Sequence, residues 1–310
     1  MSVARLRGFV RRLSRSATAG LKLWLCVLAF STVAHAEETV RIGFYQGARR
    51  EMSRTDLRNA FSLWSQELAA TFKLPVSVTF YEDIDKMRTA FERGEINAVN
   101  ADAMTLATKF NPADLADGFS VAVPGGWNML LLASRESDIH SVGGLLGKRI
   151  ALLEDDQTAT TYLETVCWRQ YGRECSKVFS DIQHVPTNSQ AVMRLFFGKV
   201  DAVLVYRYGY ELSREMNPQL RQKIGPVLAE VPFSGMYYAF FSGKVPGAFV
   251  ERNLKLIPTL HTYPRGRQLL DIFKMDHLEV ASPQELEPFL QLDDTLRELK
   301  NQHARKTKGK

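Results

Sequence analysis

The sequence predicts an α/β protein of two lobes, each a mostly parallel sheet flanked by helices, with two crossover strands as the hinge between them. Three observations predict this class. Strand-like and helix-like segments alternate along the chain at the spacing of βαβ units. A short pattern from one such unit recurs in the second half of the chain. A Pro-Gly-Gly sequence at residues 124–126 breaks the chain between the two regions.

Residues 37–125 are predicted to form the first part of lobe 1. Residues 39–45 alternate in polarity and predict a strand. A strand at 75–81, a helix from Asp83 to Gly94 and a strand at 96–99 continue the alternation. An amphipathic helix is expected from residue 53, because apolar residues recur every three or four positions: Leu57, Phe61, Trp64, Leu68 and Phe72.

Residues 126–232 are predicted to form lobe 2, and residues 233–310 to return to lobe 1 and end in helices. Two long apolar stretches, 127–134 and 231–241, are suited to crossing between the lobes. The basic residues 305–310 predict a solvated, frayed end. The other predicted elements are strands at 150–153, 181–185 and 200–205, and helices at 158–170, 188–197, 250–260, 265–275 and 283–300.

The recurring pattern lies at residues 91–99 and 196–203. Around Gly94 and Gly198, both segments show a helix end, a glycine C-cap, a charged residue, a β-branched residue, Asn or Asp, and then Ala-Val. Two such units indicate two lobes of similar construction. A coincidence between two short βαβ motifs is the alternative.

Residues 1–36 predict a secretory signal peptide. Six basic residues and no acid precede or enter an apolar stretch at 23–33, and Ala-His-Ala at 34–36 is a cleavage site. An uncleaved membrane anchor is the alternative, which the cleavage site and the short apolar stretch argue against. Cys26 follows Leu-Trp-Leu rather than the small residues of a lipoprotein signal, so we expect no lipid attachment. These features predict a periplasmic protein exported by the Sec route.

The net positive charge of the chain comes from the predicted signal peptide. The chain has 40 Lys and Arg and 34 Asp and Glu, and removal of the six basic leader residues leaves 34 of each. The net charge of +6 therefore gives no indication of nucleic-acid binding.

Two cysteines remain after the leader, Cys167 and Cys175. A helix stop at residues 172–174 would reverse the chain between them, and an oxidising compartment would allow a disulfide, which we favour over two unpaired cysteines. The histidines are scattered without ligand spacing, so no metal or cofactor is predicted. We see no Ser-His-Asp order and no clear carboxylate pair, so an enzyme is not predicted.

The segment 143–165 carries the strongest functional pattern. It runs from a Gly-marked turn through an apolar strand and an acidic loop into a helix. Thr158, Thr160 and Thr161 fall at the helix start, where free N–H groups, hydroxyls and the positive end of the helix dipole favour an anion. The alternative is that these threonines only cap the helix.

This segment resembles the periplasmic solute-binding proteins of ABC transporters, specifically the phosphate/phosphite/phosphonate-binding (PhnD-like) family. The resemblance covers nearly all of the mature chain and implies a two-lobed, type II-like periplasmic binding protein. That family has an Asp-Pro-x-Ser-Thr-Ser-Gly-Tyr loop that holds phosphonate oxygens. Thr158, Ala159 and Thr160 take the Ser-Thr-Ser places, so one hydroxyl is lost at Ala159, and Thr161 replaces the glycine.

The resemblance implies further ligand-facing residues at strand ends. Asn188 stands where the family often has a histidine, and its amide can still donate a hydrogen bond. Tyr45 and Gln46 fall on the first strand-end loop. Asn100 and Asp102 fall on the loop after the third strand.

Three residues, Asp102, Arg207 and Trp127, keep two interpretations. Asp102 either meets a cationic group of the ligand or caps the next helix, and we favour the cap. Tyr206 and Arg207 follow the strand at 200–205 and would reach the cleft, where Arg207 suits an oxyanion; otherwise Arg207 is an exposed helix residue. Trp127 is either a wall of the hinge or part of the core, and we favour the core.

Together these observations predict a monomeric solute-binding component of an ABC uptake system. It would bind a small oxyanion, such as a phosphonate, phosphite or phosphate, between its lobes and deliver it to a membrane permease. A periplasmic sensor that feeds a signalling receptor, and a binding protein for another small anionic solute, are the alternatives.

Overall fold

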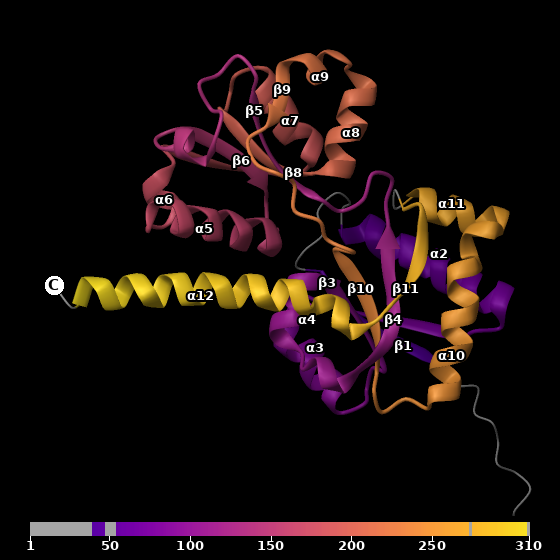
Figure 1. The fold of residues 1–310 in the computed structure, drawn as a ribbon. Helices are drawn as coiled ribbons and strands as arrows, with labels where there is room; N and C mark the ends of the chain where they lie inside the picture. The colour runs from indigo at the N-terminus through magenta and orange to yellow at the C-terminus, as the bar shows by residue number, and fades with distance from the viewer. Residues whose placement is uncertain (1–38, 47–53, 273–274, 309–310) are drawn as a thin grey trace, which may run out of the picture. The chain divides into compact units, whose positions relative to one another are not determined.

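The computed structural model describes residues 39–46, 54–272 and 275–308 (Figure 1). The predicted signal peptide, its cleavage site and Cys26 lie outside these residues. Within the described residues, no helix is both long enough and apolar enough to span a membrane.

A six-stranded sheet forms the first lobe, in the order β11-β4-β10-β3-β1-β2. Strand β1 pairs in parallel with β2 and β3, whereas β10 runs antiparallel to both β3 and β4. Its strands are β1 (Val40–Tyr45), β2 (Val76–Tyr81), β3 (Ala98–Asp102), β4 (Leu115–Ala122), β10 (Tyr237–Ser242) and β11 (His277–Ala281). Its helices are α2 (Arg54–Phe72), α3 (Ile84–Glu92), α4 (Ala103–Lys109), α10 (Gly247–Leu256), α11 (Pro264–Ile272) and α12 (Glu287–Lys308), with 3-10 turns η2 (Pro112–Asp114), η4 (Ile257–Thr262) and η5 (Pro283–Leu286).

A five-stranded sheet forms the second lobe, in the order β7-β6-β8-β5-β9. Strand β6 pairs in parallel with β7 and β8, and β5 runs antiparallel to its neighbours. Its strands are β5 (Met129–Ser134), β6 (Arg149–Leu153), β7 (Asp181–Val185), β8 (Ala202–Tyr206) and β9 (Ile224–Pro226). Its helices are α5 (Gln157–Tyr171), α6 (Cys175–Val178), α7 (Asn188–Phe196), α8 (Arg207–Met216) and α9 (Gln219–Lys223), with the 3-10 turn η3 (Val142–Leu145).

Helices cover both faces of the six-stranded sheet because successive side chains of β1 point to opposite sides. Phe44 packs against Phe61 of α2, with ring centroids 4.5 Å apart. On the other face, Gly43 lies against Met87 of α3, and a Cβ at this position would come within 2.3 Å of Ile96. Glycine is therefore required where α3 approaches the strand closely.

Helices α3 and α7 end in the same way. Gly94 and Gly198 follow them with φ values of +73° and +66°, a left-handed conformation that glycine adopts without strain. The two segments that share a sequence pattern therefore share a helix end followed by a strand, β3 in one sheet and β8 in the other.

The two long apolar stretches each begin in a segment that crosses between the sheets and continue as a strand of one sheet. Strand β5 is an internal strand of the five-stranded sheet, and β10 is inserted between β3 and β4. The chain crosses between the sheets in the short segments before these strands. Apolar runs of this kind do not distinguish a crossing strand from a strand buried on both faces. The expectation of a frayed tail is corrected for residues 305–308, because α12 continues as a helix to Lys308, and residues 309–310 lie outside the described residues.

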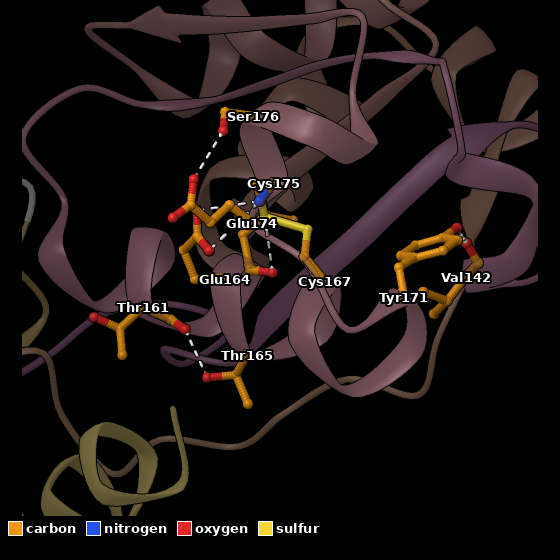
Figure 2. Close-up of a disulfide and its surroundings, with 10 residues drawn as sticks. Val142, Thr161, Glu164, Thr165, Cys167, Tyr171, Glu174, Cys175 and Ser176 are labelled. Atoms are coloured by element: carbon orange, nitrogen blue, oxygen red, sulfur yellow. Dashed lines mark hydrogen bonds between the residues drawn. A yellow bond between two sulfur atoms is a disulfide. The ribbon is translucent and has the colours of Figure 1, made fainter. Parts of the chain in front are cut away.

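The predicted disulfide is confirmed, and Figure 2 shows it joining Cys167 of α5 to Cys175 of α6, with 5.4 Å between the Cα atoms. Gly172 ends α5 with a φ of +62°, and the reversal it allows brings the second cysteine back. The Glu164 carboxylate accepts a hydrogen bond from the Cys175 N–H at 3.3 Å. Both cysteines are buried.

The C-terminal helix α12 packs along α5 (Figure 1). The His303 ring meets the edge of Trp168, with ring centroids 5.4 Å apart. Gly172 leaves room for this contact, because a Cβ there would lie 3.3 Å from the His303 ring.

Candidate ligand-binding site

Asp156 organises the start of α5. It is the N-cap residue, and its Oδ1 accepts a hydrogen bond from the Ala159 N–H at 2.8 Å. Its Oδ2 accepts a hydrogen bond from the Tyr206 hydroxyl at 2.7 Å. Burial raises the pKa of Asp156 from 3.8 to about 6, against the lowering effect of these hydrogen bonds, and the nearby charge of Asp102 raises it further.

Part of the predicted anion pocket at this helix start is used by the chain itself. The Asp156 carboxylate accepts a hydrogen bond from the Ala159 N–H, so one of the amides that we expected to face a ligand is already paired. The Thr160 hydroxyl is also used, since it donates to the Asp156 carbonyl oxygen at 2.8 Å. The cap is an aspartate rather than one of the predicted threonines.

Thr158 keeps an available polar group. Thr158 is 1% exposed, and its hydroxyl has no hydrogen-bond partner among the described residues. Thr161 is also buried; its hydroxyl lies 3.5 Å from the Gln157 amide nitrogen, and its carbonyl oxygen accepts from Thr165 (Figure 2). An unpaired buried hydroxyl is costly, so Thr158 is the better candidate for ligand contact.

Asp102 caps helix α4, as the favoured interpretation predicted. Its Oδ1 accepts a hydrogen bond from the Thr105 N–H at 2.9 Å. Its Oδ2 is buried and has no partner among the residues that the structure describes. Burial raises the pKa of this carboxyl as well. The two interpretations are thus compatible: one oxygen caps the helix and the other is available.

Tyr45 and Gln46 lie at the end of β1, as expected for the first strand-end loop. Burial has the largest effect in raising the pKa of Tyr45. The negative charges of Asp102, Asp83 and Asp155 raise this pKa further, by decreasing amounts. The Gln46 side chain is buried, and neither of its polar atoms has a partner in the described part of the chain. Residues from both lobes therefore converge on an acidic region.

An aromatic cluster closes one side of this region. The Trp127 ring lies edge-on to the rings of Tyr206, Tyr208 and Tyr237, at centroid distances of 5.9, 5.0 and 5.7 Å. Its indole N–H donates to the Val121 carbonyl oxygen at 2.7 Å, and the side chain is buried, so Trp127 belongs to the core. Burial and the Asp156 charge hold the pKa of Tyr206 well above its usual range.

Asn188 and Arg207 are engaged within the protein. The Asn188 side-chain oxygen accepts from the Tyr206 N–H at 2.9 Å, and its amide donates to the Tyr208 hydroxyl at 3.1 Å. Arg207 pairs with Glu230, which also accepts from Asn128. Asn188 therefore holds the end of β8 in place. Arg207 is paired with Glu230 and is not an unpaired cation.

Asn100 faces an apolar cavity that adjoins the site. Its side chain lines an apolar cavity under helix α2 rather than the acidic region. It remains close along the chain, because Asp102 follows two residues later on the same strand.

The resulting site is acidic and incompletely hydrogen-bonded. It offers the donors of Thr158 and Gln46 and the acceptor of Asp102, all unpaired among the described residues. No basic residue is among the described groups that displace the pKa values of Asp102 and Asp156. Within the same residues, no cluster of three or more His, Cys, Asp or Glu is arranged to hold a metal ion. Such a site can hold a cation beside the carboxylates and an oxygen acceptor at the unpaired donors.

Sequence reasoning did not select Asp156, Tyr208 or Tyr237 as site residues. An available signal for Asp156 was its position immediately before the helix, where aspartate is a favoured N-cap. Tyr237 carried no local signal, because β10 joins the first sheet only through pairing with distant strands.

The two sheets with flanking helices define a two-lobed periplasmic binding protein. The sequence matches, over residues 51–286, the family described as ABC transporter, phosphonate, periplasmic substrate-binding protein. The chain belongs to this family. Members are the periplasmic substrate-binding components of ABC transporters rather than enzymes. Comparison with the curated proteins found no match.

Solved structures show the same fold. A binding protein component of an ABC phosphonate transporter from Pseudomonas aeruginosa has a TM-score of 0.59 at 11% identity, covering 86% of this chain and 89% of its own. PhnD1 from Prochlorococcus marinus, in complex with methylphosphonate, has a TM-score of 0.58 at 15% identity, covering 84% and 99%. A protein from Xanthomonas citri bound to chloride has a TM-score of 0.59 at 12% identity, covering 85% and 99%.

Proposed function

We propose that this binding protein takes a zwitterionic phosphonate, in which an ammonium group accompanies the phosphonate. The membership of the family supports the phosphonate. The observation that supports an ammonium group in the ligand is the pair of buried carboxylates, Asp102 and Asp156, each with a raised pKa. A bound cation would relieve the cost of ionising both carboxylates in a buried place.

In this proposal the phosphonate meets neutral donors. The hydroxyl of Thr158 and the amide of Gln46 are buried and unpaired in the described structure, so a ligand oxygen would satisfy them. The hydroxyl of Tyr45 would add a third donor, since its raised pKa keeps it protonated. A buried oxyanion held by several donors gains more from each hydrogen bond than it would in water.

The test is a thermal-shift screen with matched ligands. We compare 2-aminoethylphosphonate with ethylphosphonate, which lacks only the amine, and add phosphate, phosphite, sulfate and glycine. The amino compound at a hundred times its dissociation constant should stabilise the protein by about 2.7 kcal/mol. If ethylphosphonate raises the melting temperature as much as the amino compound does, the carboxylates do not bind an ammonium group. If glycine is the only compound that raises it, the ligand is not a phosphonate.

The cellular role follows from the same family. We propose that the chain is exported by a cleaved Sec signal at residues 1–36, remains unlipidated and monomeric, and delivers its ligand to a membrane permease. Size-exclusion chromatography and mass spectrometry of periplasmic protein test this directly: a mature chain that starts at Glu37 and elutes as a monomer is expected. A dimer, or a retained or lipid-modified leader, would contradict it.

A further inference from the structure

An apolar cavity lies in lobe 1, between the six-stranded sheet and helix α2. It has a volume of about 90 Å³. Ile42 and Val78 form part of its floor on the sheet, and Trp64 and Leu68 of α2 form part of its roof. These α2 residues lie four positions apart, so they belong to one stripe of the helix. The cavity therefore lies beneath the apolar face of the helix.

Among the described residues that line this cavity, four have polar side-chain groups: Trp64, Ser65, Asn100 and Tyr237. The Ser65 hydroxyl is used within α2, where it donates to the Phe61 carbonyl oxygen at 2.9 Å. The Asn100 side chain has no hydrogen bond to another described residue, and it is half-buried. The cavity is thus a hydrocarbon-like space with a polar end at Asn100.

This polar end lies beside the candidate site. Asn100 precedes Asp102 by two residues on β3, so both side chains leave the strand on the same face. In the pairing of β3 with β10, Ala239 lies opposite Asn100 and Tyr237 lies opposite Asp102. Tyr237 lines the cavity and also contacts Trp127 of the aromatic cluster, at a centroid distance of 5.7 Å. One end of the cavity and the acidic site therefore share the same strand ends.

We propose that this cavity receives a hydrocarbon side chain of the bound ligand. The inference rests on the proposed function and narrows it: the ligand is a 1-aminoalkylphosphonate with an apolar side chain. An engineered cavity of about 150 Å³ holds benzene, so by proportion a space of this size takes about four carbon atoms. The ammonium and phosphonate remain at Asp102, Asp156 and Thr158, and the side chain passes Asn100.

A homologous series of ligands tests this assignment by isothermal titration. The probes are aminomethylphosphonate, which has no side chain, and 1-aminoalkylphosphonates with methyl, ethyl, propyl and butyl side chains, with 2-aminoethylphosphonate as the reference ligand of the proposed function. Each added methylene buried in the cavity should tighten binding about fourfold. Affinity that is independent of side-chain length, or that falls with it, overturns the inference even when the reference ligand binds.

A variant that fills the cavity provides the second arm. Ala239→Leu should leave the affinity for 2-aminoethylphosphonate unchanged and abolish the gain along the series. Ser65→Leu, which fills the space from the helix side, should act in the same way and serves if Ala239→Leu does not fold. Ala69→Leu is the matched control, because Ala69 lies on the exposed side of α2. A gain that persists in the filled variants overturns the inference.

The outcomes separate the two proposals. If no phosphonate of the series and no reference ligand binds, the proposed function fails and the cavity assignment fails with it. If the reference ligand binds and the longer side chains bring no gain, only the cavity assignment fails. A gain in the wild type and in Ala69→Leu that is lost in Ala239→Leu supports both.

Discussion

Replacement of Asp156 by asparagine tests the electrostatic description of the site without disturbing its geometry. Asparagine is as good an N-cap as aspartate, so its side-chain oxygen should still accept the Ala159 N–H. Its amide can donate to the Tyr206 hydroxyl oxygen, which now accepts. The substitution therefore keeps both contacts and removes the negative charge.

The expected magnitude follows from the pKa. The pKa of Asp156 is raised from 3.8 to about 6 on folding, so the native state binds this proton more tightly than the unfolded state. The corresponding stability is fully present below about pH 4 and is lost as the pH rises to about 6. The displacement corresponds to at most about 3 kcal/mol. Relative to wild type, Asp156→Asn should therefore gain up to that amount between pH 4 and pH 7.

The assay is urea unfolding followed by circular dichroism at pH 4, 5, 6 and 7. Asp83→Asn is the matched control, because Asp83 caps α3 in the same way, accepting from the Asp85 N–H at 2.9 Å, on an exposed surface. The control leaves Asp156 intact and should retain the wild-type pH dependence. A residual slope in Asp156→Asn belongs to Asp102, whose pKa is also raised. Parallel curves for wild type and Asp156→Asn would refute the reasoning.

Four further outcomes are expected. Thr158→Val should weaken phosphonate binding severalfold in titration calorimetry while leaving the melting temperature equal or higher, because it removes an unpaired buried hydroxyl. The double variant Cys167→Ala, Cys175→Ala should lose about 2.5 kcal/mol of unfolding free energy, from a loop with a sequence separation of 8; an unchanged urea midpoint would contradict this. Gly209→Ala should lower stability by about 1–3 kcal/mol in urea unfolding, because its Cβ would lie 2.3 Å from the Asn188 Cβ. Affinity for an aminoalkylphosphonate should fall below about pH 6, where Asp156 becomes neutral, and Asp156→Asn should lack this fall.

Local sequence patterns predicted the parallel parts of both sheets well. Strands β1, β2, β3, β6, β7 and β8 all end within three residues of the predicted segments on the side that leads to the site. Each is flanked by a helix with its own apolar stripe and its own glycine or aspartate boundary, so the signal is contained in a short window. The disulfide was predictable for the same reason, since its cysteines are separated by one helix end.

The antiparallel strands β4, β9 and β11 were not predicted, and the sheet positions of the extended stretches that contain β5 and β10 could not be predicted in this way. Strand β4 contains Asp117 and Gly118, which break its apolar pattern. A Cβ on Gly118 would lie 1.9 Å from the Ala239 carbonyl oxygen, so the glycine is required by β10, which is more than a hundred residues away in the sequence. The position of β10 between β3 and β4 is decided by this pairing, and no local pattern encodes it.

The strand ends and the helix start of the candidate site could be predicted, whereas the role of Asp156 as the cap of that helix was not. Strand ends and the α5 start identified most of the residues that converge, because ligands of open α/β sheets bind at the carboxyl ends of strands. The charge of the site depends on which side chain accepts hydrogen bonds from the backbone N–H groups at the helix start. Threonine hydroxyls would have left room for an anion, whereas the Asp156 carboxylate brings its own negative charge to that place.

The presence of the Asp156 carboxylate at the helix start changes which charges the ligand must supply. The helix start stabilises the Asp156 carboxylate, and the same carboxylate anchors the Tyr206 hydroxyl at the end of β8. Asp102 repeats the arrangement in the other lobe, where it caps α4 with one oxygen and leaves the second unpaired among the described residues. Each lobe thus brings a buried acid on a helix start to the site, and repulsion between them opposes ionisation of both. A ligand with a positive charge removes that repulsion, so the ligand's ammonium would hold the two helix starts together as well as select the substrate.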